Sequence, residues 1–270
     1  MRKTRGFYVP AFKKNWAWAA APIIVIAILL FVAPAYWPEY RGYVYIAVLL
    51  LLAIHLALVG WLVNNRPMGV FIDNRNRISL SKLQAGAWTV VVLSGFATIA
   101  AFNAGAEIYQ DSSVTALAIV IPGELLLAMG ISATSLVAAP ALLSLKAKEE
   151  PAKEAESDAQ KKLGDSVSVS ANGKVLTKDS ATEASWSDLV TGDELGNAGS
   201  PDLGKIQQGL ITLLLLGCYG AYIFAELSSS AEKLGSLPAL DKSFVWLMGI
   251  SHTSYLAYKA APHTTSENPS

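Results

Sequence analysis

Met129-Gly130-Ile131-Ser132-Ala133-Thr134-Ser135 recurs further along the chain as Met248-Gly249-Ile250-Ser251-His252-Thr253-Ser254. Upstream of this motif, Leu80-Ser81-Lys82-Leu83-Gln84 is similar to Leu203-Gly204-Lys205-Ile206-Gln207, and the offset between these two segments is nearly the same. Because the two offsets almost coincide, the pattern indicates one duplicated unit rather than two separate coincidences. Each copy of the unit holds two apolar segments. The repeat therefore indicates the architecture independently of any local motif.

The composition predicts an integral membrane protein. Hydrophobic residues make up 53% of the chain and charged residues only 16%, whereas a soluble domain has about a quarter charged residues. The charges are also segregated, because six windows contain none: 15–38, 42–65, 83–106, 125–145, 206–225 and 243–258. About 20 apolar residues cross the hydrocarbon core as a helix. The last window is shorter, and it crosses only if Lys242 and Lys259 reach toward the two interfaces. We therefore predict an all-α integral membrane protein with six transmembrane helices.

The repeat divides the chain into hairpins of helices and a small cytoplasmic insert. The predicted order is a basic N-terminus (1–15), a transmembrane hairpin (16–64), repeat unit 1 (65–145), the insert (146–200), repeat unit 2 (201–260) and a tail (261–270). Each repeat unit holds two spans, which is an even number, so both copies enter the membrane from the same side. This predicts a parallel internal repeat about an axis along the membrane normal.

Basic residues set the expected orientation. Nearly all Lys and Arg residues fall on the side of the N-terminus, whereas the other side holds Arg41, Lys233 and Lys242. This bias predicts that both termini are cytoplasmic. A signal peptide cleaved after Ala33-Pro34-Ala35 is the alternative for the first span. The length of the apolar run, and Trp37 as an interfacial anchor, favour a retained helix.

The insert reads as a solvated, peripheral segment. Residues 146–162 alternate Lys, Glu and Ala, which is typical of solvated helix or disorder. Asn172-Gly173 between two short β-rich runs predicts a small hairpin, and Ser185-Trp186-Ser187-Asp188 is the pattern of a capped short helix. Residues 73–77 and Asp193-Glu194 precede the equivalent helices of the two units, and both are predicted to be solvated turns. We expect the insert to be the surface for a cytoplasmic protein partner.

Ionisable residues inside predicted spans are candidates for an ion path, because buried charge in hydrocarbon is expensive. Glu124 is either such a site or a residue that compensates the dipole at the start of a helix after Pro122. His55 lies in the middle of a span, where it either relays protons or forms a hydrogen bond between helices. In both cases the structural alternative is favoured.

The repeated motif admits two interpretations. Gly130 with Thr134, and Gly249 with Thr253, form small-residue faces that let membrane helices approach closely. The alternative is a polar path lined by hydroxyl groups, with the candidates Ser132, Ser135, Ser251 and Ser254. Gln84 and Gln207 lie one turn inside the membrane boundary, and their amides are expected to join the two units.

Other classes of function find no support in the sequence. No phosphate-binding loop, dinucleotide turn, nucleophile elbow or metalloprotease helix occurs, so we predict no enzyme and no cofactor. The three histidines lack Cys or carboxylate neighbours at ligand spacing, which excludes a recognisable metal site. The formal net charge is zero, so no basic surface for nucleic acid is expected.

Residues 76–84 (NRISLSKLQ), 184–189 (ASWSDL) and 192–197 (GDELGN) carry a resemblance, together with the two Met-Gly-Ile-Ser segments. The chain resembles a group of bacterial multi-spanning membrane proteins over about residues 65–260. The resemblance implies a place in the bacterial inner membrane and supplies no activity or ligand. Two functions remain in view: a homo-oligomeric channel-like or transport-like protein, and a non-catalytic scaffold or accessory subunit that docks partner proteins.

Overall fold

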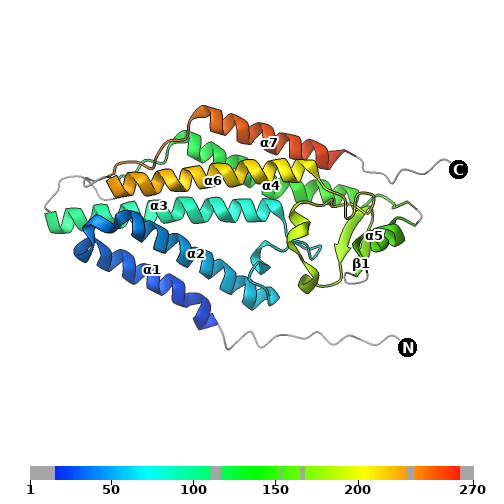
Figure 1. The fold of residues 1–270 in the computed structure, drawn as a ribbon, viewed down its shortest axis with the longest axis horizontal. Helices are drawn as coiled ribbons and strands as arrows, with labels where there is room; N and C mark the ends of the chain where they lie inside the picture. The colour runs from blue at the N-terminus through cyan, green and yellow to red at the C-terminus, as the bar shows by residue number, and fades with distance from the viewer. Residues whose placement is uncertain (1–15, 111–116, 153, 165–167, 230–233, 262–270) are drawn as a thin grey trace.

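A computed structural model describes residues 16–110, 117–152, 154–164, 168–229 and 234–261. Its long helices are α1 (Trp16–Tyr36), α2 (Arg41–Asn64), α3 (Leu80–Gln110), α4 (Gly123–Lys146), α6 (Leu203–Ser229) and α7 (Lys242–Ala260). They run side by side as an elongated bundle, and the segment between α4 and α6 covers one end of it (Figure 1). The predicted helical architecture is therefore correct in outline.

Five of these helices, α1, α2, α3, α4 and α6, are long and apolar enough to cross a membrane. This agrees with a multi-pass membrane protein. Helix α7 is not among the five candidates, so the prediction of six spans is not confirmed. Its 19 residues begin at Lys242 and include Lys259 in the last turn, and these charges lower its apolar character.

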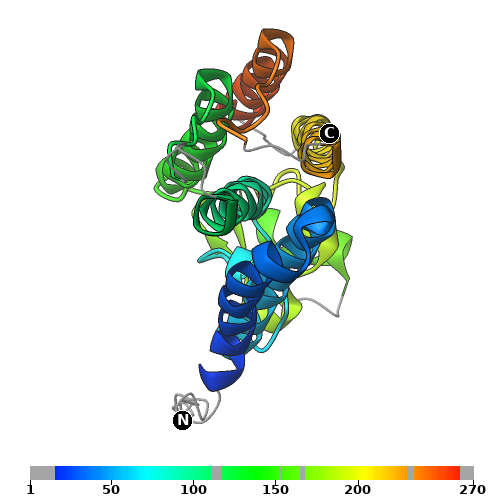
Figure 2. The same cartoon turned by 90° about the vertical axis from the view of Figure 1, so that its left-hand side faces the viewer.

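The helices that follow the first hairpin form a four-helix group. Helices α3 and α6 both start at the end that carries the insert, and α4 and α7 return to that end (Figure 1). Helix α4 packs along α7, α3 along α6, and each hairpin also packs on itself, and Figure 2 shows the four helices end-on beside α1 and α2. These directions match the expected parallel arrangement, while the duplication itself stays a prediction.

The main apolar core lies between these four helices. Trp88, Leu125, Tyr219, Ile223 and Met248 are all almost completely buried in it. The rings of Trp88 and Tyr219 are tilted against each other with centroids 6.0 Å apart. Because the outer faces of the helices also carry many exposed apolar side chains, the bundle presents an apolar surface to its surroundings, as a membrane protein does.

The first hairpin approaches the group closely at a glycine. A Cβ atom at Gly42 of α2 would lie 2.1 Å from Ser228 Oγ of α6, so a larger residue there would displace the Ser228 hydroxyl. His55 of α2 lies with Nδ1 2.8 Å from the carbonyl oxygen of Ala19 in α1. The structure thus gives His55 a hydrogen bond between neighbouring helices.

The insert is folded, and it adds a sheet to the predicted all-α fold. It holds α5 (Ala155–Leu163), strands β1 (Val169–Asn172) and β2 (Val175–Lys178), and two short 3-10 helices, Ala181–Glu183 and Trp186–Leu189. The strands form the predicted antiparallel hairpin. The predicted cap is also confirmed, because the Asp188 side chain accepts a hydrogen bond from the Ser185 amide at 2.9 Å.

The hairpin turn rests on the end of α4. Gly173 has φ +57°, a conformation that favours glycine, and a Cβ atom there would lie 2.4 Å from the carbonyl oxygen of Ala147. The amide of Lys174 donates to the carbonyl oxygen of Lys146 at 3.2 Å. Both contacts hold the insert against the membrane bundle rather than letting it extend away.

Candidate functional site

A buried cluster of charges joins the insert to the ends of the helices. The turns at 73–77 and 193–194, which the sequence suggested to be solvated, lie inside it. Arg77 is only 1% exposed and Glu194 only 2%, so this prediction is wrong. The error has a physical cause. Residues of opposite charge that lie more than 100 positions apart in the sequence form ion pairs here, and in doing so they exclude water.

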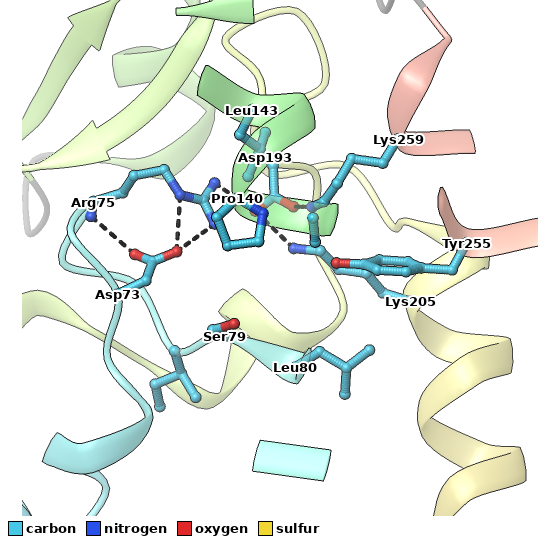
Figure 3. Close-up of a pocket in the computed structure, with 12 residues that line it drawn as sticks. Asp73, Arg75, Ser79, Leu80, Pro140, Leu143, Asp193, Lys205, Tyr255 and Lys259 are labelled. Atoms are coloured by element: carbon cyan, nitrogen blue, oxygen red, sulfur yellow. Dashed lines mark hydrogen bonds and ion pairs between the residues drawn. The ribbon is translucent and has the colours of Figure 1, made fainter. Parts of the chain in front are cut away.

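Asp193 lies at the centre of the cluster (Figure 3). One of its carboxylate oxygens lies 2.8 Å from Arg75 Nη1 and 2.9 Å from Lys205 Nζ. Arg77 Nη1 lies 3.7 Å from the same oxygen, and the other oxygen pairs with Lys259. One carboxylate from the insert therefore binds the segment before α3, the first turn of α6 and the last turn of α7.

Further ion pairs surround this centre. Asp188 accepts from Lys178 Nζ at 2.7 Å and lies 3.3 Å from Arg77 Nε. Lys146, in the last turn of α4, donates to Glu194 Oε1 at 2.6 Å. With this pair the insert contacts four of the long helices or their flanking segments through buried charge. The docking is thus specific in position, because each pair is held at a fixed point of a rigid element.

The electrostatics follow from burial against this density of cations. Burial by itself raises the pKa of the Asp193 carboxyl group. The four surrounding cations, Arg75, Lys205, Lys259 and Arg77, outweigh burial and hold that pKa well below its usual range. Burial likewise lowers the pKa of Lys178, against the opposing effect of Asp188. Asp193 is therefore ionised at any physiological pH and is the anion on which the cluster depends.

The cluster leaves little free volume. A cavity of about 20 Å³ lies among Asp73, Arg75, Asp193, Lys205 and Lys259, next to Pro140 and Tyr255 in Figure 3. That is about the room of one water molecule. The charges of the cluster are therefore satisfied mainly by one another, and they join the insert to the ends of the helices.

Acid should release the insert. The pKa of Asp193 is depressed in the folded state, so its contribution to stability is present above its ordinary value of about 3.9 and is lost as the pH falls through the folded value. We expect cleavage of the insert by pepsin to rise steeply as the pH falls below about 4. The Asp193→Asn variant should lack this steep step; an unchanged step in that variant would contradict the assignment to Asp193.

A second polar group lies inside the bundle, where α3, α4, α6 and α7 meet. Ser135 Oγ of α4 is 2.6 Å from His252 Nδ1 of α7, and Gln208 Nε2 of α6 is 3.1 Å from the same nitrogen. Gln208 Nε2 also donates to Gln84 Oε1 of α3 at 2.9 Å. Gln84 Nε2 in turn donates to Thr212 Oγ1 at 2.8 Å. One chain of hydrogen bonds thus crosses all four helices.

The glutamine predicted to join the units is displaced by one position. Gln84 is buried and bonded as expected, but Gln207 is exposed and the buried partner is Gln208. In the repeat, Gln207 aligns with Gln84 because each is the last residue of the pattern Lys-Leu/Ile-Gln. A shift of one residue turns a helical side chain by about 100°, which moves Gln207 to the outer face.

The hydroxyl candidates divide in the same way. Ser132, Ser135 and Ser251 are buried at 1%, 0% and 2% exposure, whereas Ser254 is exposed. The buried hydroxyls lie in the contact between α4 and α7, so they pack between helices. The atoms Ser132 Oγ, Ser251 Oγ, His252 Nε2 and Gln208 Oε1 have no hydrogen-bond partner among the described residues.

The small-residue faces do not form the helix contact within the chain. Gly130, Thr134 and Thr253 are exposed, and a Cβ atom at Gly130 would meet nothing within 4 Å. At Gly249 the nearest atom to such a Cβ is Ile131 Cδ1, at 3.7 Å. The prediction of close packing through these residues is corrected: the serine row beside them faces the neighbouring helix instead.

Glu124 lies in the first turn of α4, directly after Pro122 and Gly123. This is the position that the dipole interpretation requires, since an acidic side chain is favoured at the start of a helix. At the corresponding start of α7, Asp241 caps the helix and accepts from the Ser243 amide at 2.8 Å. The two acids differ in position but lie at equivalent helix starts.

Several residues of these clusters were not singled out from the sequence. In the repeated motif His252 stands opposite Ala133, which argues against a shared role. The patterns that contain Asp188, Lys205 and Lys259 indicate a helix cap, a repeat and a helix end, and none of them indicates an ion pair. The available signal was a set of basic residues at helix ends with acidic residues in the insert. No group of three or more His, Cys, Asp or Glu arranged for a metal ion occurs in the part of the chain that the structure describes.

Comparison with protein-family models, with curated proteins and with solved structures gave no match for this chain.

Proposed function

We propose that this chain is a multi-pass membrane scaffold, a non-catalytic accessory protein that presents a fixed platform beside the bilayer. The observation that supports the proposal is the docking of the insert through Asp193, which binds cations from three different parts of the bundle. A flexible tether would need no such cluster, because burying charges costs desolvation energy. That cost is explained if the ion pairs fix the position of the insert. The bacterial inner membrane remains the proposed location, with the insert and both termini in the cytoplasm.

Helix α7 completes the proposed membrane domain as a sixth span. Its 19 residues extend about 28 Å, against a hydrocarbon core of about 30 Å. Its end at Lys259 lies in the charge cluster, and Lys242 at its start reaches toward the opposite interface. The packing of α7 along α4 and α6 supports a transmembrane course.

The platform offers an apolar side chain for a partner. Trp186 of the insert is 63% exposed and Val190 is 41% exposed, while the 3-10 helix that holds Trp186 packs against α6. An exposed aromatic residue on a rigid support is a frequent anchor in protein interfaces. The proposed partner is therefore a protein that meets the insert close to the membrane surface.

Site-specific photo-crosslinking in living cells tests the scaffold proposal. A photoreactive amino acid at position 186 should give one discrete protein adduct. The same residue at Lys161, an exposed position of α5, should give none and serves as the matched control. Equal adduct patterns at the two positions, or lipid adducts alone at position 186, would refute docking at this surface.

A transport-like role is the second candidate, and one observation favours it. The polar chain through His252 leaves buried oxygen and nitrogen atoms without partners, and such atoms suit a polar guest inside a membrane. Proton flux into liposomes separates the candidates: a transporter should lose flux in His252→Leu, whereas a scaffold gives no flux above protein-free liposomes.

A further inference from the structure

A cavity of about 300 Å³ lies at the end of the bundle opposite the insert. Its walls come from α3, from the end of α6, from the start of α4 and from the segment 234–239 that leads to α7. Most of the residues that line it are apolar, the polar side chains are those of Tyr222, Glu226 and Ser236, and polar atoms make up more than half of the exposed wall. A concavity that combines apolar residues with a few polar groups is the usual form of a site for a small molecule.

Hydrogen bonds fix the wall formed by segment 234–239. Asn103 of α3 donates from Nδ2 to the carbonyl oxygen of Leu234 at 2.8 Å and accepts from the Leu234 amide at 3.2 Å. Tyr219 of α6 donates its hydroxyl to the carbonyl oxygen of Pro238 at 3.0 Å. Both ends of the segment are therefore tied to long helices.

The middle of the same segment pairs with the residues before α4. The amide of Val120 donates to the carbonyl oxygen of Gly235 at 2.8 Å, and the amide of Leu237 donates to the carbonyl oxygen of Val120 at 3.0 Å. The Leu237 side chain is fully buried. The described wall of the cavity is thus held in place by hydrogen bonds and by a buried side chain.

Glu226 is the charged residue of this cavity. It lies in the last turn of α6, a helix apolar enough to cross a membrane. Helix α6 has 27 residues and a length of about 40 Å, so its last turn reaches beyond the hydrocarbon core to the level of the headgroups. No ion pair of the Glu226 carboxylate is found among the described residues.

Tyr222 lies one turn before Glu226, so the two side chains share one face of α6. A carboxylate attracts a cation, and the face of an aromatic ring attracts an ammonium group in addition. One carboxylate alone is a poor site for a divalent metal ion, which requires several oxygen ligands. Apolar residues that share the lining with the pair, among them Pro122 and Leu234, favour a cation that carries carbon substituents.

The volume indicates the size of the ligand. A cavity of about 150 Å³ holds benzene, so this cavity admits a molecule of about a dozen non-hydrogen atoms. From the geometry we infer that it binds an organic ammonium group, with Glu226 as the counter-ion and Tyr222 against the cation. The group is either part of a free amine or the headgroup of an ethanolamine lipid, since both share this chemistry. The site is independent of the scaffold proposal, because it lies at the other end of the bundle.

Calorimetric titration of the full chain in detergent tests the inference. Benzyltrimethylammonium, which has 11 non-hydrogen atoms, should bind saturably, and neopentylbenzene, its neutral isostere, should bind at least about tenfold more weakly. Equal binding of the two probes to the unmodified chain would overturn the inference without any variant. So would the absence of saturable binding of the cation.

Two variants locate the site. Glu226→Gln should weaken binding of the cation by about tenfold or more, and Tyr222→Leu should weaken it by a smaller factor. Glu39→Gln is the matched control, because Glu39 is an exposed carboxylate in the turn between α1 and α2 at the same end. Loss of binding in the control, or full binding in Glu226→Gln, would overturn the assignment.

Nanodiscs separate the two sources of the ammonium group. If a lipid headgroup occupies the site, the apparent affinity for benzyltrimethylammonium should fall in discs with phosphatidylethanolamine relative to discs with phosphatidylglycerol. The fall should disappear in Glu226→Gln, whereas general attraction to an anionic surface would persist there. If free amines are the ligands, ethanolamine should compete equally in both discs. Competition in neither form would again refute the site.

Discussion

Replacement of Asp193 by alanine is expected to destabilise the docked insert by about 3–5 kcal/mol, the usual effect of removing one partner from a buried charge cluster. The carboxylate is 5% exposed and is shared by Arg75, Lys205 and Lys259. Without it these cations stay buried close together and repel one another. We expect a lower thermal midpoint and rapid cleavage of the insert by trypsin at neutral pH.

The pair of Lys174 with Glu149 supplies the control for this experiment. Its oxygen–nitrogen distance of 2.7 Å resembles those of the cluster, but the Glu149 side chain is 51% exposed. Glu149→Gln should therefore leave the stability almost unchanged, because an exposed ion pair contributes little. If Asp193→Ala proved as mild as Glu149→Gln, the cluster would not be what holds the insert in place.

Replacement of Gln208 by leucine should be the second damaging change, at about 1–3 kcal/mol. Gln208 connects Gln84 with His252, so its loss leaves a buried amide and a buried imidazole without one partner each. Measured bonds between membrane helices average less, but here one side chain serves two neighbours. Thermal unfolding in detergent measures the change.

The adjacent residue offers a control of identical chemistry. Gln207→Leu removes the same amide from the exposed face of α6, and we expect its stability to be unchanged or slightly increased in an apolar environment. Equal destabilisation by the two substitutions would show that the polar chain across the four helices contributes nothing specific.

The apolar helices and the local turns of the insert could be predicted from the sequence, whereas the docking of the insert could not. Charge-free windows fixed α1, α2, α3, α4 and α6, because a membrane imposes both a length and a composition on a helix. The hairpin at Gly173 and the cap at Ser185 followed from local chemistry. These features depend on neighbouring residues alone, and for that reason they could be predicted.

The docking of the insert depended on pairs that no local pattern reveals. Arg75 and Asp193 are 118 positions apart, and each by itself resembles an ordinary charged residue in a turn. Similarly, two consecutive glutamines made Gln207 and Gln208 equivalent in the sequence, and only the rotation of α6 against its neighbours distinguishes them. Tertiary packing decided both points.

The position of Asp193 has a consequence for how the chain is assembled. Lys205 lies in the first turn of α6, close to Asp193 in the sequence, whereas Lys259 lies in the last turn of α7. Lys259 therefore reaches the same carboxylate only after the chain has travelled to the far end of the bundle and returned. During synthesis Asp193 emerges before either lysine, and at that stage Arg75 and Arg77 are the cations of its final environment that already exist. A last hairpin inserted in the wrong direction would leave Lys259 remote from Asp193. The complete set of ion pairs at this one residue therefore distinguishes a correctly threaded molecule from a misthreaded one.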